Sequence, residues 1–183
     1  RPVAMVQLRI VDAEMNDVPH DGKSQGEVVV RAPWLTQGYL HDTEKSEELW
    51  AGGWLHTGDV AVMSEDGWLK IVDRIKDVIK SGGEWISSID LENVAVGHPE
   101  VAEACVIGVS HPKGDERPVL FIVRTDGSTL DKDGALAFLE GKIAKWWTPD
   151  AVLFVDELPH TATGKLYKSV LREKYKDYVL PTA

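Results

Sequence analysis

Period-two alternation of apolar and polar residues, or a short β-branched run between turn residues, predicts strands in the first part of the chain. The segments with such a pattern are Val6–Ile10, Gly26–Arg31, Val60–Met63 and Trp68–Val72. The last two flank Ser64-Glu65-Asp66-Gly67, whose residue types favour a hairpin turn. Asp42 or Thr43 can cap a short helix over Glu44–Leu49. We therefore expect a lobe built mostly of short strands.

The later part mixes strand and helix patterns without a regular alternation. Strands are predicted at Ile75–Ser81 and Trp85–Ile86 around a glycine pair, and at Val101–Val109, Pro118–Arg124 and Ala151–Val155. Helices are predicted from an N-cap at Ser88 to Gly97, over about 131–146, and over Leu166–Tyr175. This mixture is typical of an α+β fold with a small mixed sheet and helices.

A charged segment, Asp73-Arg74-Ile75-Lys76-Asp77, separates the two parts, and Gly82-Gly83 follows it closely. Charged residues before a double glycine indicate an exposed joint leading into a tight turn. We therefore predict a β-rich lobe over residues 1–72, a joint over 73–77 and an α+β domain over 78–183. No internal repeat or low-complexity linker is present.

Composition limits the classes of partner. The chain has 183 residues, of which 43% are hydrophobic, and a net charge of −10. The charge is −6 for residues 1–72 and −4 for residues 73–183, with no basic face or tail. Duplex nucleic acid and an anionic membrane are therefore not expected as partners.

Several features predict a soluble protein of a reducing compartment. Cys105 is the one cysteine and lies in an apolar run, so we expect an inert, buried thiol and a cytoplasmic location. No apolar run is long enough for a transmembrane segment. The chain begins Arg1-Pro2-Val3 without methionine, which suggests a fragment or a processed product.

Three polar motifs could carry chemistry, and each also has a purely structural interpretation. Asp59 follows a glycine and could accept hydrogen bonds from vicinal hydroxyls, although the local sequence alone favours a turn that caps a strand. Lys165 lies on a glycine-containing loop as a mobile cation, or as a solvated surface lysine. Arg74 and Lys76 offer a guanidinium fork and a point charge, or a solvated charge run. The six histidines, His56 included, show no metal-ligand spacing, so no metal site is predicted.

The motifs gain meaning from their order along the chain. They are Gly38-Tyr39-Leu40, Gly53-Trp54-Leu55-His56-Thr57-Gly58-Asp59, Asp66-Gly67-Trp68-Leu69, Asp73–Asp77, Ser81-Gly82-Gly83-Glu84-Trp85-Ile86-Ser87, His98–Ala104, Pro159–Lys165 and Leu171-Arg172-Glu173. Together they resemble the C-terminal part of the adenylate-forming acyl-CoA synthetases. The run Ile79–Ile86 is most similar to the medium- and long-chain fatty acid branch.

The resemblance implies a role for each matching residue. Asp59 corresponds to the family's ribose-binding aspartate, and Arg74 to the arginine that assists it. Lys76 stands at the hinge position, with Asp73 and Asp77 completing the linker. Lys165 corresponds to the mobile lysine of adenylate formation. The turn that lines the CoA tunnel corresponds to Gly82, Gly83, Glu84 and Trp85.

The resemblance also implies the reaction and its substrates. A fatty carboxylate would attack the α-phosphate of Mg²⁺-bound ATP, and Lys165 would offset the developing charge as pyrophosphate leaves. Rotation about Lys76 would then withdraw Lys165 and present the Gly82-Gly83 turn, so that the CoA thiol attacks acyl-AMP and AMP is released. ATP, CoA and a fatty acid are the expected ligands, and a homodimer is an expected assembly.

Departures from the family pattern set limits. The family's phosphate-binding loop, its Tyr-Gly-x-Thr-Glu motif and its acyl pocket do not occur in this sequence, so residues 1–72 are interpreted as the last lobe of the large N-terminal domain. Trp85 stands where some members have arginine. An adenylation module that loads a carrier protein, a non-catalytic nucleotide- or CoA-binding module and a luciferase-like oxidative enzyme remain alternatives.

Overall fold

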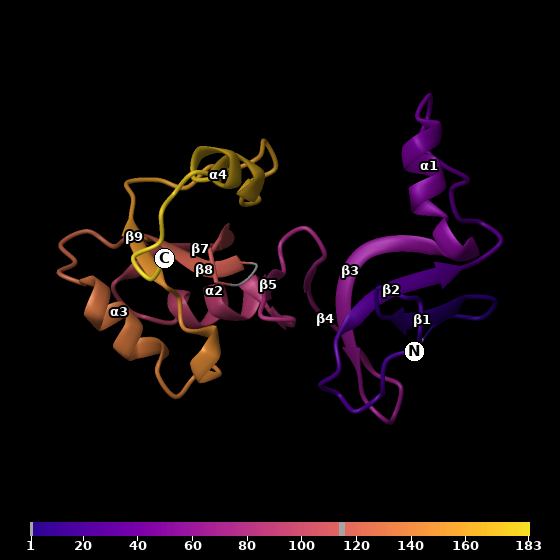
Figure 1. Cartoon of the computed structure of the whole chain (residues 1–183), viewed down its shortest axis with the longest axis horizontal. Helices are drawn as coiled ribbons and strands as arrows, with labels where there is room; N and C mark the ends of the chain where they lie inside the picture. The colour runs from indigo at the N-terminus through magenta and orange to yellow at the C-terminus, as the bar shows by residue number, and fades with distance from the viewer. Residues whose placement is uncertain (1, 114–115) are drawn as a thin grey trace. The chain divides into compact units, whose positions relative to one another are not determined.

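The chain divides into two compact units, and each is described by itself. The computed structural model describes residues 2–113 and 116–183 (Figure 1). The first unit ends at Lys76 and the second begins at Asp77.

The first unit contains a four-stranded sheet in the order β1-β2-β3-β4, with every neighbouring pair antiparallel. Its elements are β1 (Gln7–Val11), β2 (Gly26–Arg31), α1 (Thr43–Leu49), the 3-10 turn η1 (Ala51–Gly53), β3 (Leu55–Met63) and β4 (Leu69–Arg74). One core cluster joins inward-facing residues of three strands, namely Ile10, Val28, Ala61 and Met63. The alternating patterns therefore mark strands, as predicted.

Local details of this unit confirm one prediction and correct another. Asp42 is the N-cap of α1, and its carboxylate accepts a hydrogen bond from Lys45 N at 3.0 Å. The stretch Gly53–Asp59, interpreted as a turn that caps a strand, instead lies mostly inside the long strand β3. Glycines at both ends of the stretch suggested a turn, but Gly58 lies inside the strand, where it bends the backbone without ending the strand.

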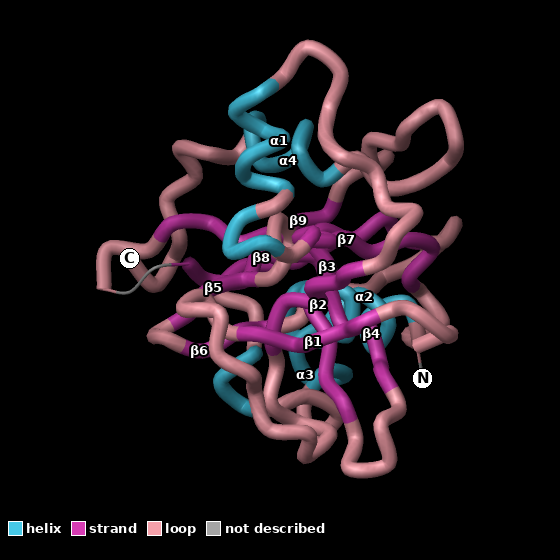
Figure 2. The backbone as a smooth tube through the Cα atoms, turned by 90° about the vertical axis from the view of Figure 1, so that its right-hand side faces the viewer, coloured by secondary structure: helices cyan, strands magenta, loops and turns pink. Residues whose placement is uncertain are grey.

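The second unit is built around the mixed three-stranded sheet β7-β8-β9, in which β8 pairs antiparallel with β7 and parallel with β9. Figure 2 shows these strands in magenta among the helices and loops. Its elements are β5 (Ile79–Ser81), β6 (Glu84–Ile86), α2 (Ser88–Val96), β7 (Val101–Ser110), β8 (Glu116–Arg124), α3 (Lys132–Leu139), the 3-10 turn η2 (Lys145–Trp147), β9 (Ala151–Phe154) and α4 (Lys168–Lys174). The predicted α+β class with a small mixed sheet is confirmed.

Both faces of this sheet are buried. Along β7, Ala104 and Val106 pack with Leu91 of α2 and Leu139 of α3. The alternate residues of the strand join a second cluster that contains Leu171 of α4. Coverage on both faces explains why the strands appear in the sequence as continuous apolar runs.

Three local predictions in this unit were wrong. The N-cap of α2 is Ser87, whose hydroxyl accepts from Asp90 N at 3.1 Å, rather than Ser88. The helix predicted over about 131–146 ends at Leu139, and Gly141 follows it with φ +75°. The strand predicted from Ile75 begins only at Ile79, because residues 75–77 form a turn.

Across residues 2–113 and 116–183, no helix has the length and apolarity that crossing a membrane requires.

Candidate functional site

Asp59 lies just after a bend in β3. Gly58 has φ +71°, a conformation that favours glycine. The Gly58 N–H donates to Glu27 Oε1 at 3.0 Å, and the Thr57 hydroxyl donates to Val28 O at 2.7 Å. Asp59 N–H in turn donates to Thr57 Oγ1 at 3.1 Å. The backbone beneath Asp59 is therefore fixed by its neighbouring strand.

Glu27 and His56, which sequence reasoning did not connect, support the same bend. Glu27 Oε2 lies 2.8 Å from His56 Nδ1, and both side chains are mostly buried. His56 Nε2 lies 3.2 Å from Ala51 O. His56 thus has a structural role on this side of the sheet. Only the pairing of β2 with β3 brings these two residues together.

Asp59 and Arg74 face each other across β3 and β4. They are register partners, and Arg74 Nε lies 3.6 Å from Asp59 Oδ1. The side chains are 38% and 71% exposed, respectively. An exposed carboxylate beside an exposed guanidinium can accept hydrogen bonds from paired hydroxyls and donate to a further oxygen. These are the groups that the predicted role in holding ribose hydroxyls requires.

The segment 73–77 was expected to be an exposed joint, but only part of it is exposed. Asp73 is fully buried in β4, and its carboxylate accepts a hydrogen bond from Arg74 N at 2.7 Å. Ile75 N–H donates to Gly58 O at 2.8 Å. On the other side, Arg172 Nη1 lies 2.6 Å from Asp77 Oδ1. The exposed Lys76 therefore stands between neighbours that are each held within their own unit.

The Gly82-Gly83 turn joins β5 to β6, with Ser81 and Glu84 as the last paired residues. Its glycines have φ +59° and +83°, the conformation of a tight two-residue hairpin turn. A Cβ atom added to either glycine would meet no atom within 4 Å. The turn therefore presents bare backbone next to an exposed Glu84 and a half-buried Trp85.

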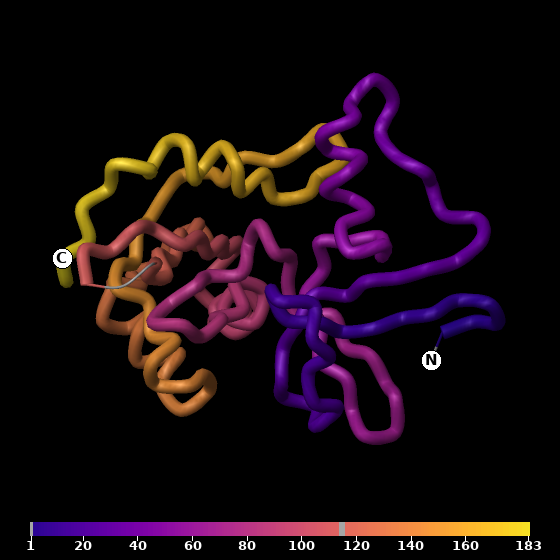
Figure 3. Tube along the Cα trace, turned by 45° about the vertical axis from the view of Figure 1, so that its right-hand side comes forward, coloured from indigo at the N-terminus to yellow at the C-terminus, as the bar shows by residue number. Residues whose placement is uncertain are grey.

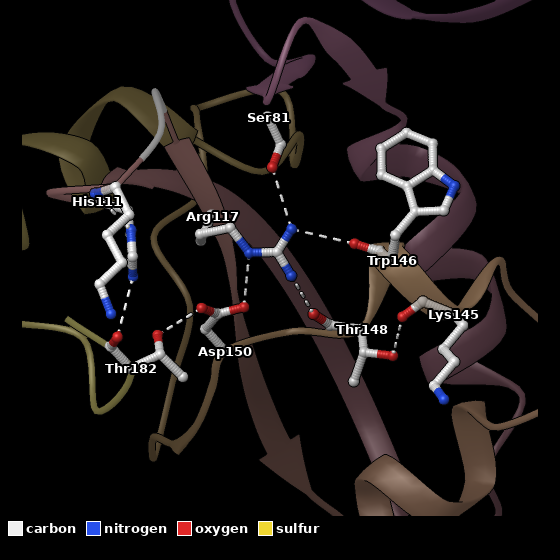
Figure 4. A network of polar contacts seen from close by, with 9 residues as sticks. Ser81, His111, Arg117, Lys145, Trp146, Thr148, Asp150 and Thr182 are labelled. Atoms are coloured by element: carbon white, nitrogen blue, oxygen red, sulfur yellow. Dashed lines mark hydrogen bonds and ion pairs between the residues drawn. The ribbon is translucent and has the colours of Figure 1, made fainter.

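Arg117, near the start of β8, bonds to Ser81 beside this turn and to residues of the segment 146–150 (Figure 4). Its Nη1 donates to Ser81 Oγ at 3.0 Å and also to Trp146 O at 3.0 Å. Its Nε donates to Asp150 Oδ1 at 2.7 Å, and its Nη2 donates to Thr148 O at 3.0 Å. Sequence reasoning gave Arg117 no role.

Lys165 belongs to the segment between β9 and α4, which is coloured orange to yellow in Figure 3. Thr161 N–H donates to Lys165 O at 2.8 Å, and Gly164 N–H donates to Thr161 O at 2.9 Å. Gly164 has φ +78°. Lys165 is exposed, and across residues 2–113 and 116–183 its ammonium has no ion-pair partner. The loop thus holds the backbone and leaves the cation free to move.

The base of the same loop is fixed by Lys168 in the first turn of α4. Lys168 Nζ lies 2.8 Å from Glu92 Oε1 and 2.6 Å from Ser88 Oγ, both on α2. The Lys168 and Glu92 side chains are only 10% and 12% exposed. Glu92 Oε1 also accepts from Val106 N at 2.8 Å. This buried pair connects α4 to α2 and β7.

Cys105 lies beside this pair, and its burial is confirmed. Burial raises the pKa of the Cys105 thiol to about 12, and the negative charge of Glu92 adds to the effect. A thiol with so high a pKa is neutral near pH 7 and is a poor nucleophile.

The predicted site residues therefore fall into two groups. The first unit holds Asp59, Arg74, Asp73 and Lys76, whereas the second holds Asp77, the turn residues Gly82–Trp85 and Lys165. Residues 2–113 and 116–183 contain no cluster of three or more His, Cys, Asp or Glu side chains that could hold a metal ion. We therefore assign no residue of this chain to Mg²⁺.

Comparison with known proteins shows which proteins this chain is similar to. Residues 90–165 match the AMP-binding enzyme C-terminal domain. The chain is 53% identical, over 97% of its length, to 3-methylmercaptopropionyl-CoA ligase of Ruegeria lacuscaerulensis and covers 32% of that protein. It is 46% identical, over 97% of its length, to a long-chain-fatty-acid–CoA ligase of Thermus thermophilus, of which it covers 33%.

A solved structure shows the same fold. ATP-bound MatB from Rhodopseudomonas palustris matches with a TM-score of 0.84 and 33% identity, over 96% of this chain and 35% of that one. The chain is therefore similar over residues 90–165 to the AMP-binding enzyme C-terminal domain, and over nearly all of its length to CoA ligases. The relatives named above are CoA ligases, and the chain spans about a third of their length.

Proposed function

We propose that this chain is the C-terminal part of an AMP-forming acid–CoA ligase that activates a fatty carboxylate as acyl-AMP and transfers the acyl group to CoA. The observation that carries the proposal is 53% and 46% identity to two CoA ligases over 97% of the chain. The exposed Asp59–Arg74 pair and the free Lys165 are consistent with it.

In the first step, Asp59 accepts hydrogen bonds from the ribose hydroxyls of ATP, and Arg74 donates to a neighbouring oxygen. The carboxylate oxygen bonds to the α-phosphorus while the bond to pyrophosphate breaks. The Lys165 ammonium, which has no ion-pair partner across residues 2–113 and 116–183, approaches the carboxylate and phosphate oxygens and offsets their charge.

In the second step, the second unit turns about Lys76, which withdraws Lys165 and brings the Gly82-Gly83 turn to the reacting centre. The CoA thiol loses its proton to water and its sulfur bonds to the acyl carbon, while the bond from that carbon to the phosphate oxygen breaks and AMP leaves. The open space around both glycines suits the passage of a pantetheine arm. We thus propose Asp73, Lys76 and Asp77 as the hinge, and Gly82–Trp85 as the wall of the CoA tunnel.

The proposal is tested with the longer protein that contains this chain. Saturated fatty acids of increasing length, supplied with ATP, Mg²⁺ and CoA, should yield acyl-CoA, AMP and pyrophosphate in equal amounts. ADP in place of AMP, or no thioester with any acid, would refute it. We propose further that the 183-residue chain alone forms no acyl-adenylate, and acyl-dependent ATP–pyrophosphate exchange by that chain would contradict this.

A second candidate substrate is a short thioether acid, 3-methylmercaptopropionate. Identity to the ligase named for the corresponding thioester is higher than to the long-chain ligase, 53% against 46%. The ratio of kcat/KM for this acid and for dodecanoate, measured on the longer protein, decides between them.

A further inference from the structure

Arg117 of β8 connects two other segments of the second unit through one guanidinium, namely Ser81 and residues 146–150. It donates to the side chain of Ser81 beside the glycine turn, to two carbonyls of the segment 146–148, and to the carboxylate of Asp150 (Figure 4). The Arg117 and Asp150 side chains are 22% and 10% exposed, so this ion pair is largely shielded from solvent. An arginine fork with all three nitrogens bonded is rigid.

The element that it holds has little rigidity of its own. Strands β5 and β6 have three residues each and form a separate two-stranded sheet. Such a short hairpin is at most marginally stable by itself. Its glycine turn has no side chain that could pack against the rest of the unit. Ile79 and Ile86 anchor the far end of the hairpin, because both are fully buried in the core. At the end that carries the turn, Ser81 and Lys80 are the residues through which β8 can fix its position.

Glu116, the residue before Arg117, also holds β5. Glu116 Oε2 accepts a hydrogen bond from Lys80 N at 3.1 Å. Its side chain lies over Gly108, where an added Cβ would be only 2.7 Å from Glu116 Oε2. Two successive residues of β8 thus hold two successive residues of β5, one through the backbone and one through a hydroxyl.

We propose that Arg117 is a positioning residue for the transfer of the acyl group to CoA, because it holds the Gly82-Gly83 turn against β8. This inference rests on the proposed function, in which the turn lines the path of the thiol. Arg117 does not itself touch the reacting atoms. Its loss should misplace the turn and slow acyl transfer, whereas adenylate formation, which relies on Asp59, Arg74 and Lys165, should continue.

The test uses the longer protein and separates the two half-reactions. For Arg117→Gln we expect ATP–pyrophosphate exchange within about twofold of the unmodified protein, and kcat/KM for CoA, with acyl-adenylate supplied, lower by about tenfold or more. Arg117→Lys keeps the charge but not the fork, so it should restore little of the loss. Equal losses in both half-reactions, or an unchanged CoA step, would overturn the inference.

Arg124→Gln is the matched control, because Arg124 lies on the same strand but donates to Leu130 O and stacks on Phe154. It should leave the ratio of the two half-reactions unchanged. If Arg117→Gln does not fold, Ser81→Ala removes only one acceptor of the fork. That variant should slow the CoA step by about threefold and spare adenylation; a CoA step at the unmodified rate would overturn the inference.

Hydrogen exchange keeps the two proposals distinguishable. In the 183-residue chain, Arg117→Gln should make the amides of residues 82–85 exchange faster, while those of β7 stay protected. Unchanged exchange at the turn would refute the positioning role even in an active ligase. An unmodified longer protein without ligase activity, by contrast, would overturn the proposed function and the inference that depends on it.

Discussion

Two turns of the second unit are proposed to serve successive steps, and they are held in different ways. The Gly82-Gly83 turn is fixed from outside, by the hydrogen bonds of Arg117 and Glu116 to β5. The Lys165 loop is held by bonds among its own residues and, at its base, by Lys168. The first turn is anchored by another strand at the two residues before its glycines, whereas the second is held by bonds within the loop and at its base.

This difference suits the chemistry proposed for each. A backbone surface that guides a thiol works only if it keeps its shape, so an external clamp is useful. A lysine that follows charge from a carboxylate to a phosphate needs a stable loop beneath it and a mobile side chain above it. Substitutions should therefore impair different half-reactions, depending on which turn they alter.

The largest effect is expected for Lys165→Ala in the longer protein. Removing the mobile cation should lower acyl-dependent ATP–pyrophosphate exchange by about 10³-fold. Thioester formation from supplied acyl-adenylate should change by less than about threefold. Lys132→Ala, which removes an exposed lysine of α3, is the control and should affect neither rate. A similar loss in both half-reactions would count against the role of Lys165.

A large effect on stability is expected for Lys168→Met, which leaves Glu92 buried without its ion pair. We expect a loss of about 3 kcal/mol in the free energy of unfolding of the 183-residue chain. Denaturant unfolding followed by circular dichroism measures it. Lys176→Met removes a pair with Glu173 whose side chains are 59% and 76% exposed, and it should cost less than about 0.5 kcal/mol. Equal costs for the two variants would show that the base of the loop is not anchored as described.

A smaller, more diagnostic effect is expected from one alanine in each turn. Gly83 and Gly164 have φ of +83° and +78° with open space around them, so an alanine strains only the backbone. Gly83→Ala should slow the CoA step, and Gly164→Ala the adenylation step, each by about tenfold. Each variant is the control for the other. If both slowed the same step, the division between the turns would fail.

The smallest effect concerns Cys105, which lies beneath α4 in the same cluster as Leu171. Its thiol should resist a thiol-specific reagent at pH 8 and react quickly once the chain is unfolded in denaturant. Burial raises its pKa from the ordinary value of 9.0 to about 12, so the thiol is neutral in both states below pH 9.0. As pH rises from 9.0 through about 12, the unfolded chain ionises first and stability falls.

Cys105→Ala should not show the fall in stability above pH 9.0 that ionisation of this thiol causes. The variant should also leave the rates of both half-reactions within about twofold of the unmodified rates. Rapid modification of the folded chain at pH 8 would mean that the base of α4 opens readily.

Features that depend on residues close together in the sequence were predicted, whereas features that depend on contacts between distant residues were not. The strands at Gly26–Arg31 and Val101–Val109, and the Asp42 cap, follow from neighbouring residues and were found. The end of α3 was missed because its apolar spacing continues past Leu139, whereas Gly141 turns the chain away.

The supporting residues of the site could not be predicted. Arg117 has partners at Ser81, Thr148 and Asp150, which only the folded sheet brings together. Glu27 reaches His56 for the same reason. Side chains that approach a ligand can be identified by motif, whereas those that hold the motif in place depend on tertiary contacts. The roles proposed for Asp59, Arg74 and Lys165 remain predictions.

Lys76 has a mechanical consequence that follows from its neighbours. The Ile75 N–H is bonded to Gly58 O, and the Asp77 side chain is bonded to Arg172. We therefore propose that the two backbone torsions of Lys76 take up most of the rotation at the junction. In the proposed hinge, rotation about only these two torsions would move the second unit, so few paths would connect its two positions. Proline at position 76 would lock one of those torsions and could trap the protein at a single stage of its cycle.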